Sequence, residues 1–347
     1  MTAFRVVRAS RFSIVATAVS VAAVVVLALG PSWASRGTKL SLIQIFYYLS
    51  LAQMWNLLAG YAGLVSVGQQ GFVGVAAYAV FVLAERNGID PFLAMALAGL
   101  LTAALSAPVA LFAFRLKGGY FAIGTWVIAE VFRLITLRIK PLGAGKVQSL
   151  TVRNTFAGYS IERRQDLVYW AALALAVGAT LIVVLVLRSR QGLALRSIRD
   201  DEGGARGLGV QVTRTRLVVW VIAAGWVGMT GALIHINSAT ITNRDAFDVL
   251  SWTALVVFIV IIGGVGSTAG PIIGVAIFWF VTERFKDSDT GRFMILGALA
   301  AVMAVVAPRG IDGLIQRVRS FELFPIRRRL VVDDSAVPTP DLTSGHP

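Results

Sequence analysis

Long apolar runs, separated by short polar junctions, constrain this 347-residue chain more than any other feature. An α-helix needs about 20 apolar residues to cross a bilayer, and a barrel strand would instead show short alternating stretches, so the continuous runs favour helices. Hydrophobic residues make up 57% of the chain and charged residues 14%, whereas soluble domains average about 45–50% and about 25%. The sequence therefore predicts an all-α, polytopic transmembrane helical bundle without strands, and it excludes an ordinary soluble enzyme.

The apolar runs predict about ten spans. Turn-forming junctions such as Gly30-Pro31 and Asn87-Gly88 separate most of them. The predicted spans lie near residues 14–30, 39–60, 64–84, 91–114, 118–137, 167–187, 216–236, 247–263, 268–284 and 292–308.

The distribution of arginine and lysine predicts that both termini are cytoplasmic. Basic residues are more frequent in the segments around Arg5, Arg115, Arg196 and Arg327 than in the loops between them, and cytoplasmic loops carry that excess. The basic residues behind the net charge of +14 are then expected to set the membrane topology and to contact anionic lipid or acidic partners. No nucleic acid is expected as a partner. The predicted parts are a cytoplasmic N-terminus (1–13), a transmembrane domain (14–308) with an extracytoplasmic loop (138–166) and a cytoplasmic loop (188–215), and a cytoplasmic tail (309–347) with a disordered end.

The first apolar run has a second interpretation. A basic start, an apolar core and the small residues of Ser32-Trp33-Ala34 also resemble a cleavable signal peptide. Residues 1–34 are therefore either a span or a signal, and the charge distribution favours the span.

An internal repeat is a further possibility that the sequence leaves open. A shift of 200 residues places the first four predicted spans on the last four, in the same direction. Transporters are often built from such repeats, with the substrate path between them. Coincidence among small and apolar residues explains the match equally well. The aligned residues are Gly63, Gly74, Val75, Ala76 and Tyr78 on Gly263, Gly274, Val275, Ala276 and Phe278.

Several kinds of chemistry are excluded by composition. The chain has no cysteine and only two histidines, so no catalytic, cofactor-binding or metal-ligating residue is expected. The run Gly143-Ala144-Gly145-Lys146 is not a P-loop, because Lys140 stands at the first glycine position and Val147 at the final Ser/Thr position.

Polar residues inside the second and third apolar runs indicate the first candidate site. Backbone and amide groups are costly in hydrocarbon, so a glycine-rich polar stretch must be buried in protein or line a wet cavity. The stretch predicts a broken or closely packed helix beside a translocation path, although glycine-mediated helix packing is an alternative. The candidate path residues here are Asn56, Ser66, Gln69, Gln70 and Tyr78.

A second candidate stretch lies in the fifth predicted span. It carries Tyr120, Thr125 and Glu130 as candidate path residues, with Arg133 one turn after the glutamate. A substrate or proton role for Glu130 is possible, but an ionisable pair at this spacing also neutralises itself, and that structural role is favoured.

The cytoplasmic stretch 188–216 is the most informative. Leu195, Ile198 and Leu208 predict a sparse apolar face, arginines and three consecutive acids cover the rest, and Gly209 is placed to end a helix. A short amphipathic helix of this kind is suited to docking into a groove on a cytoplasmic partner. A solvated loop whose arginines only set topology is the alternative.

Four motifs together resemble one known family. They lie in order at matching intervals within about residues 40–308, and the resemblance is to the larger, M-type permease subunit of branched-chain amino-acid ABC importers. The motifs are Asn56–Tyr78, Tyr120–Arg133, Gly192–Val210 and Gly263–Gly274.

This resemblance implies an inner-membrane, multi-pass transport subunit that is not an enzyme. Its implied partners are a second homologous permease, two cytoplasmic ATPase subunits that hold the ATP, and an extracytoplasmic solute-binding protein. The implied solute is a branched-chain amino acid or a related small polar molecule, and relatives that carry urea or short amides give the alternative.

The resemblance also implies that the stretch 192–210 forms the coupling helix. The family usually has alanine where Gly203 and Gly204 stand, and Lys146 departs from its Gly-rich segment, which weakens the inference about the solute. The implied ATPase-contacting residues are Arg196, Arg199, Asp200, Asp201, Glu202, Ala205 and Gly209.

Two rivals belong to other classes. A secondary transporter driven by protons or sodium would use Glu130 as its coupling carboxylate. A membrane-embedded enzyme would need a catalytic set that the sequence lacks, and His235 is better explained as a hydrogen-bonded structural residue.

Overall fold

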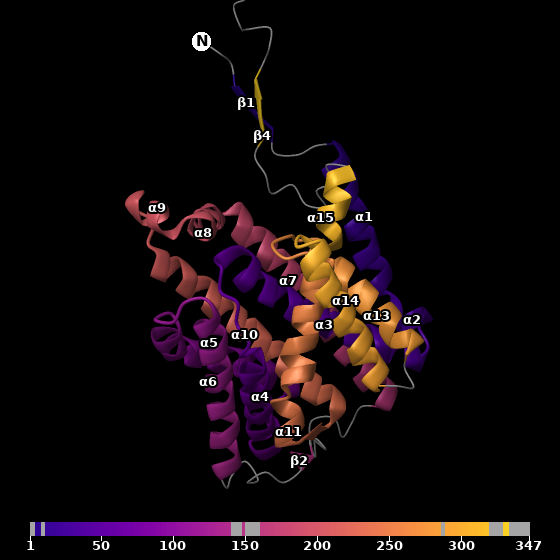
Figure 1. Cartoon of the computed structure of the whole chain (residues 1–347). Helices are drawn as coiled ribbons and strands as arrows, with labels where there is room; N and C mark the ends of the chain where they lie inside the picture. The colour runs from indigo at the N-terminus through magenta and orange to yellow at the C-terminus, as the bar shows by residue number, and fades with distance from the viewer. Residues whose placement is uncertain are drawn as a thin grey trace, which may run out of the picture.

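The computed structural model describes residues 4–7, 11–139, 148–149, 160–285, 289–318 and 329–332. It is a bundle of α-helices (Figure 1), which confirms the predicted all-α membrane class. Five helical stretches are long and apolar enough to cross a membrane, and a sixth is added if two helices that meet at 43° count as one span. The five are Pro91–Ala113, Gly119–Arg138, Ile161–Arg188, Val212–Ser238 and Asn243–Gly263.

The predicted count of ten spans is therefore not supported by the described residues. Two of the predicted spans, 64–84 and 268–284, begin with residues that are not helical. The α-helices that follow in them have only 12 and 15 residues. The first apolar helix is also short, with its apolar part at Val15–Ala28.

The first half of the chain forms helices with clear start signals. Ser35 and Ser160 cap the helices that follow them, and the carboxylate of Asp90 accepts hydrogen bonds from the amides of Phe92 and Leu93 at 2.9 and 3.1 Å. The elements are β1 (Phe4–Val7), α1 (Arg11–Ala28), α2 (Gly30–Trp33), α3 (Arg36–Asn56), the π-helical turn η1 (Leu57–Tyr61), α4 (Gln69–Val80), the π-helical turn η2 (Phe81–Arg86), α5 (Pro91–Ala113), α6 (Gly119–Arg138), β2 (Gln148–Ser149) and α7 (Ile161–Arg188).

The second half begins with two short helices and then returns to the bundle. Its elements are α8 (Arg190–Asp200), α9 (Glu202–Gly207), α10 (Val212–Ser238), β3 (Thr240–Ile241), α11 (Asn243–Ala246), the π-helical turn η4 (Leu250–Ala254), α12 (Leu255–Gly263), α13 (Gly270–Arg284), α14 (Asp289–Val306), α15 (Gly310–Val318) and β4 (Arg329–Val332).

Two short antiparallel strand pairs correct the expectation that strands are absent. Strand β1 pairs with β4, so that Phe4 lies opposite Val332, and β2 pairs with β3. Part of the tail is thus ordered by pairing with the N-terminal segment, where the sequence predicted disorder. The tail after residue 332, and residues 140–147 and 150–159 of the predicted extracytoplasmic loop, lie outside the described residues.

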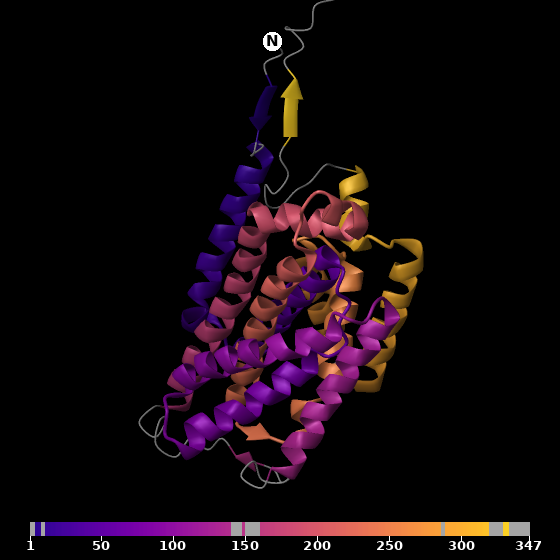
Figure 2. The same cartoon turned by 90° about the vertical axis from the view of Figure 1, so that its left-hand side faces the viewer.

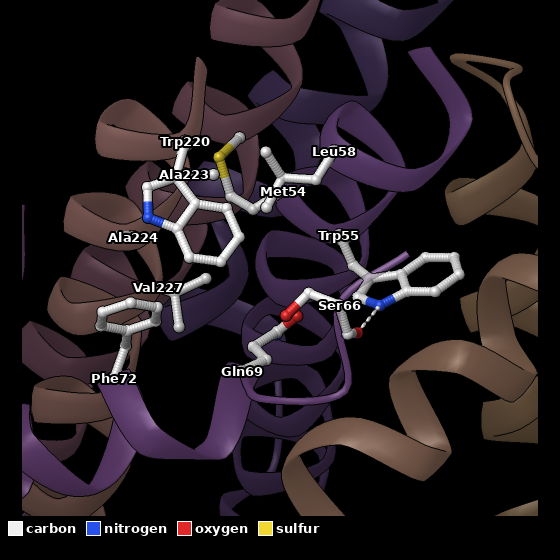
Figure 3. Close-up of a pocket in the computed structure, with 10 residues that line it drawn as sticks. All are labelled: Met54, Trp55, Leu58, Ser66, Gln69, Phe72, Trp220, Ala223, Ala224 and Val227. Atoms are coloured by element: carbon white, nitrogen blue, oxygen red, sulfur yellow. Dashed lines mark hydrogen bonds between the residues drawn. The ribbon is translucent and has the colours of Figure 1, made fainter. Parts of the chain in front are cut away.

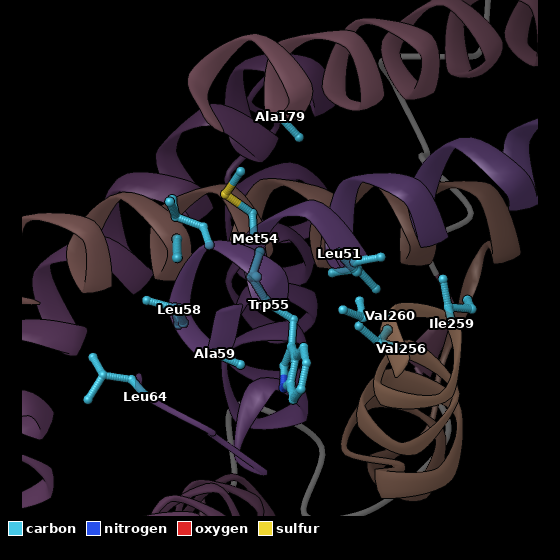
Figure 4. Close-up of a cluster of buried hydrophobic side chains, with 14 of the residues drawn as sticks. Leu51, Met54, Trp55, Leu58, Ala59, Leu64, Ala179, Val256, Ile259 and Val260 are labelled. Atoms are coloured by element: carbon cyan, nitrogen blue, oxygen red, sulfur yellow. The ribbon is translucent and has the colours of Figure 1, made fainter. Parts of the chain in front are cut away.

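Helix α10 lies at the centre of the bundle and packs against α3, α4, α5 and α7. Its most apolar window is 67% buried, more than that of any other candidate span. A large cluster of buried apolar side chains joins α3 and η1 to α12, and Figure 4 shows Leu51 of α3 beside Val256 and Val260 of α12. A second cluster, around Tyr169 and Leu233, fills the other half of the bundle. The core therefore surrounds the two broken helices.

Both breaks have the same organisation. Helix α3 continues through η1, residues 63–68 are not helical, and α4 begins at Gln69; helix α12 ends at Gly263, residues 264–269 are not helical, and α13 begins at Gly270. The two helix–break–helix units stand about 200 residues apart, at the offset of the sequence repeat.

Strands β1 and β4 and the polar helices α8 and α9 lie at one end of the bundle (Figures 1 and 2). Helix α11 and strand β2 lie at the opposite end. The predicted topology assigns the end with α8 and α9 to the cytoplasmic side, and that assignment stays a prediction.

Candidate functional site

The two breaks meet inside the bundle and are held together by Asn56. Its side-chain oxygen accepts a hydrogen bond from the backbone amide of Gly266 at 2.8 Å, and its amide donates to the carbonyl of Ser267 at 2.7 Å. Gln53, one turn earlier, donates to the carbonyl of Thr268 at 3.2 Å. Asn56 was predicted to line the path, but it is fully buried and joins one broken helix to the other.

Close backbone approach at Gly60 completes this junction. A Cβ atom at Gly60 would lie 2.5 Å from the amide nitrogen of Gly266 and from the side-chain oxygen of Asn56. Only glycine permits that distance, so the π-helical turn η1 and the second break can pack backbone against backbone.

A small cavity lies where the first break leads into α4 (Figure 3). It has a volume of about 20 Å³, which is room for one water molecule. Two of the candidate path residues, Ser66 and Gln69, line it. The other lining residues are Met54, Trp55, Leu58, Phe72, Trp220, Ala223, Ala224 and Val227.

A second cavity of about 10 Å³ lies against α6 and shares Ser66, Phe72 and Trp220 with the first. The candidate path residue Thr125 lines it, and its hydroxyl accepts a hydrogen bond from the amide of Val67 at 3.0 Å. The two cavities thus flank the first break on either side of Phe72. In this closed arrangement neither has room for a solute larger than water.

Three other predicted path residues lie elsewhere. The amide oxygen of Gln70 accepts a hydrogen bond from Thr253 at 2.5 Å, which ties α4 to η4. Tyr78 is buried and stacks on Phe247 with ring centroids 6.3 Å apart. Tyr120 is 76% exposed at the start of α6. None of the three lines either cavity.

Glu130 is held by Arg133, as the structural interpretation predicted. Both carboxylate oxygens accept from Nε of Arg133 at 2.9 Å, and a further Nη2 contact measures 2.5 Å. The same arginine donates to Asn243 at 3.3 Å, and Asn243 donates to the hydroxyl of Thr136 at 2.8 Å. The network fixes α6 to α11, and Glu130 lines neither cavity, although its neighbour Ala129 lines the second.

The polar helices α8 and α9 have an apolar underside that rests on the bundle. Ile198, Ala205 and Val212 form a small buried cluster, and Leu195 belongs to the main core. The predicted amphipathic pattern is therefore observed for Leu195 and Ile198. Leu208 departs from it, because it is 85% exposed.

The outward face of this segment holds only some of the implied ATPase contacts. Asp200 has a side chain that is 67% exposed, and Arg196 is partly exposed. Ala205 is 2% exposed and packs inside the segment. Asp201 caps α9, since its carboxylate accepts from the amide of Gly203 at 2.9 Å. Gly209 has a φ of +81° and ends the segment, as predicted.

Glu202 is the centre of an ion-pair network. Its carboxylate accepts from Arg206 at 2.7 Å and from Arg216, in the first turns of α10, at 2.9 Å. Burial raises the pKa of Glu202, but the nearby guanidinium groups of Arg216 and Arg206 together lower it by more than burial raises it. The pKa therefore lies below its ordinary value. The ion pairs are therefore intact at neutral pH and are lost only in acid, as the pH falls through the lowered pKa.

Two arginines connect this segment to the first break. Arg199 of α8 donates from Nη1 to the carbonyl of Gly60 at 3.2 Å, and Arg216 donates from Nε to the carbonyl of Ala62 at 3.3 Å. Cationic donors at the last carbonyls of a helix are favourable, because those carbonyls lack helical partners. The two hydrogen bonds therefore tie α8 and the start of α10 to the end of η1.

Three residues at these sites are not singled out by the sequence. Arg216 follows the acidic cluster by 14 residues, and only the structure shows that it donates to Glu202 at 2.9 Å. Trp220 and Met54 line the first cavity, but nothing distinguishes them from other apolar residues in the sequence.

Comparison with known proteins gives the family. The family described as "Branched-chain amino acid transport system / permease component" matches residues 38–303. The high-affinity branched-chain amino acid transport system permease protein LivM of Salmonella typhimurium is 27% identical over 81% of this chain and 71% of its own length. LivM of Escherichia coli is 28% identical over 83% of this chain and 73% of its own length.

A more distant relative comes from Methanocaldococcus jannaschii. Its probable branched-chain amino acid transport permease protein LivM is 26% identical over 54% of this chain and 54% of its own length. No solved structure matches the chain. The family match covers both broken helices, both cavities and the segment formed by α8 and α9. The chain therefore belongs to the family of branched-chain amino acid transport system permease components, and it is a multi-pass protein of the cell membrane.

Proposed function

We propose that the chain is the permease subunit of an ATP-driven importer that moves a branched-chain amino acid, or a related small polar solute, across the inner membrane. The hydrogen bonds from Arg199 and Arg216 to the end of η1 carry this proposal. These hydrogen bonds connect two parts of the chain. One is the segment of α8 and α9, which is suited to docking with a partner, and the other is the broken helix that lines the cavities. A subunit driven by a separate ATPase needs such a connection.

The mechanism we propose is alternating access. Closure of two partner ATPases displaces α8 and α9, and the two arginines transmit the displacement to η1. Because Asn56 fixes the second break to the first, both broken helices move together. The cavities beside Phe72 then open, first to one side of the membrane and later to the other.

The proposed partners follow from the same arrangement. The ATPases would contact the outward face of α8 and α9, where Leu193, Leu208 and Asp200 are exposed. ATP is bound by those partners and not by this chain. A second homologous permease would complete the path, and an extracytoplasmic binding protein would deliver the solute on the side of the 138–166 loop.

The proposed solute is an aliphatic amino acid, because most of the first cavity's wall is apolar. Met54, Leu58 and Val227 suit a branched hydrocarbon side chain better than urea or a short amide. The rival secondary transporter is disfavoured, since Arg133 engages both oxygens of Glu130.

The solute is tested in cells that lack the chain. Restoring the chain should restore uptake of labelled L-leucine, and an excess of unlabelled L-isoleucine or L-valine should lower that uptake at least about tenfold by competition for one site. Urea and acetamide should have no effect. Competition by urea or acetamide, with none by L-valine, would replace the proposed solute with the alternative one.

A further inference from the structure

Helix α4 begins in the interior of the bundle, next to the first cavity. The N-terminal residue of α4, Gln69, is 6% exposed. Gly68 before it has no side chain to cap the first turn, in which the amide of Gln70 donates to the hydroxyl of Thr253 at 3.3 Å. A helix N-terminus carries partial positive charge and unpaired amide groups, which attract an anion. Half-helices that start at mid-membrane use this property to bind anionic groups of solutes.

The side chain of Gln69 gives an independent indication of a ligand. Its Nε2 donor is buried and has no hydrogen-bond partner among the described residues, while the residue lines the cavity. Figure 3 shows Gln69 beside Ser66 within the ring of lining side chains. A buried donor without a partner is unfavourable by about 1–3 kcal/mol. The position is therefore suited to an acceptor that arrives from outside the chain.

The second broken helix lacks such a site. As at the first break, hydroxyl groups satisfy the first amides, here the hydroxyl of Ser267, which accepts from Ala269 at 3.2 Å and from Gly270 at 3.3 Å. The start of α13 also packs tightly against the backbone of Gly264. The two breaks thus differ in the side chain of Gln69, and among the described residues only the first break places an unpartnered buried side-chain donor at a cavity.

We propose that the start of α4 and the amide of Gln69 bind the carboxylate of the transported amino acid. The aliphatic side chain of the solute then lies against Met54, Leu58 and Val227 on the apolar wall. The site is closed in this structure, with room for one water molecule, and opens when the broken helices move. This inference rests on the proposed function and specifies how the permease recognises its solute.

The test uses a cysteine reporter, because the chain has no cysteine of its own. Ala223 lines the cavity opposite the start of α4, so Ala223→Cys places a thiol in the site without changing Gln69. The complete assembly is purified, and alkylation by N-ethylmaleimide is followed by the mass of this chain. L-leucine at about ten times its Kd should slow the reaction about tenfold, since one site in eleven then remains free.

Two comparisons make the test specific for the carboxylate. L-leucinamide, which has the same side chain but no carboxylate, should give no protection. Adding Gln69→Leu should abolish protection by L-leucine, whereas the same change at Gln44, outside the cavity on α3, should leave it intact. If Ala223→Cys alone impairs uptake, Ala224→Cys, which also lines the cavity, serves as the reporter.

The possible outcomes separate the two claims. A wild-type assembly that takes up no L-leucine contradicts the proposed function itself. Intact uptake with no protection of the reporter, equal protection by L-leucinamide, or protection that survives Gln69→Leu would overturn the carboxylate site and leave the proposed function standing.

Discussion

Replacing Gly60 with valine is expected to abolish uptake and to lower the thermal stability of the protein. The new Cβ would lie 2.5 Å from the amide nitrogen of Gly266 and 2.7 Å from its Cα, so backbone rather than a flexible side chain must move. Overpacking of this kind costs about 1–3 kcal/mol, and each hydrogen bond of Asn56 lost with it adds about 1 kcal/mol. The melting temperature of the purified protein and the uptake of L-leucine measure the two effects.

The matched control is Gly37→Val. Gly37 lies in the first turn of α3, and a Cβ there would meet nothing within 4 Å. This variant should therefore match the wild type in both measurements. If Gly60→Val transported L-leucine as well as Gly37→Val, the close contact between the two breaks would have no part in the mechanism.

Reversing the charge of Glu202 to lysine is expected to lower uptake at least about tenfold, which corresponds to about 1.4 kcal/mol, while insertion into the membrane is unchanged. The lysine would lie beside Arg206 and Arg216, so two ion pairs become two repulsions. Exposed ion pairs contribute little, but the side chains of Glu202 and Arg216 are only 33% and 19% exposed. Arg216 should then lose its position at the carbonyl of Ala62, and ATP hydrolysis should no longer drive uptake.

A second reversal and a charge swap control this experiment. Glu162→Lys makes the same change in an exposed first turn of α7, at the other end of the bundle, and should have no effect. Arg216→Glu combined with Glu202→Lys restores one ion pair but places a carboxylate where the carbonyl of Ala62 needs a donor, so uptake should stay low. Normal uptake by Glu202→Lys alone would show that the network does not transmit the motion of α8 and α9.

The sequence predicts the continuous spans well. Helices α5, α6, α7 and α10 each coincide with an uninterrupted apolar run. Such a run predicts a helix from local sequence alone, because its length and hydrophobicity do not depend on which helices pack beside it. The breaks are predictable only in part. The glycines and glutamines of 60–71 indicate a departure from a lipid-facing helix, but the position of the stop depends on the contact of Gly60 with Gly266, about 200 residues later in the chain.

The site shows the same limit. Ser66, Gln69 and Thr125 are recognisable because polar groups are costly at membrane depth, and the structure places all three at the cavities. Asn56 and Gln70 carry the same signal, yet their amides are satisfied by Ser267 and Thr253 from distant segments. Sequence alone cannot separate a polar side chain that holds two helices together from one that faces a path, because the difference lies in the partner.

The source of energy is the central claim, and one measurement tests it most directly. The complete assembly and the chain alone are reconstituted in separate proteoliposomes, and accumulation of labelled L-leucine is followed with ATP, with a non-hydrolysable ATP analogue, and with an ionophore. We predict accumulation only by the complete assembly, only with hydrolysable ATP, and without any effect of the ionophore. Accumulation by the chain alone that the ionophore collapses would contradict the account and identify a secondary transporter.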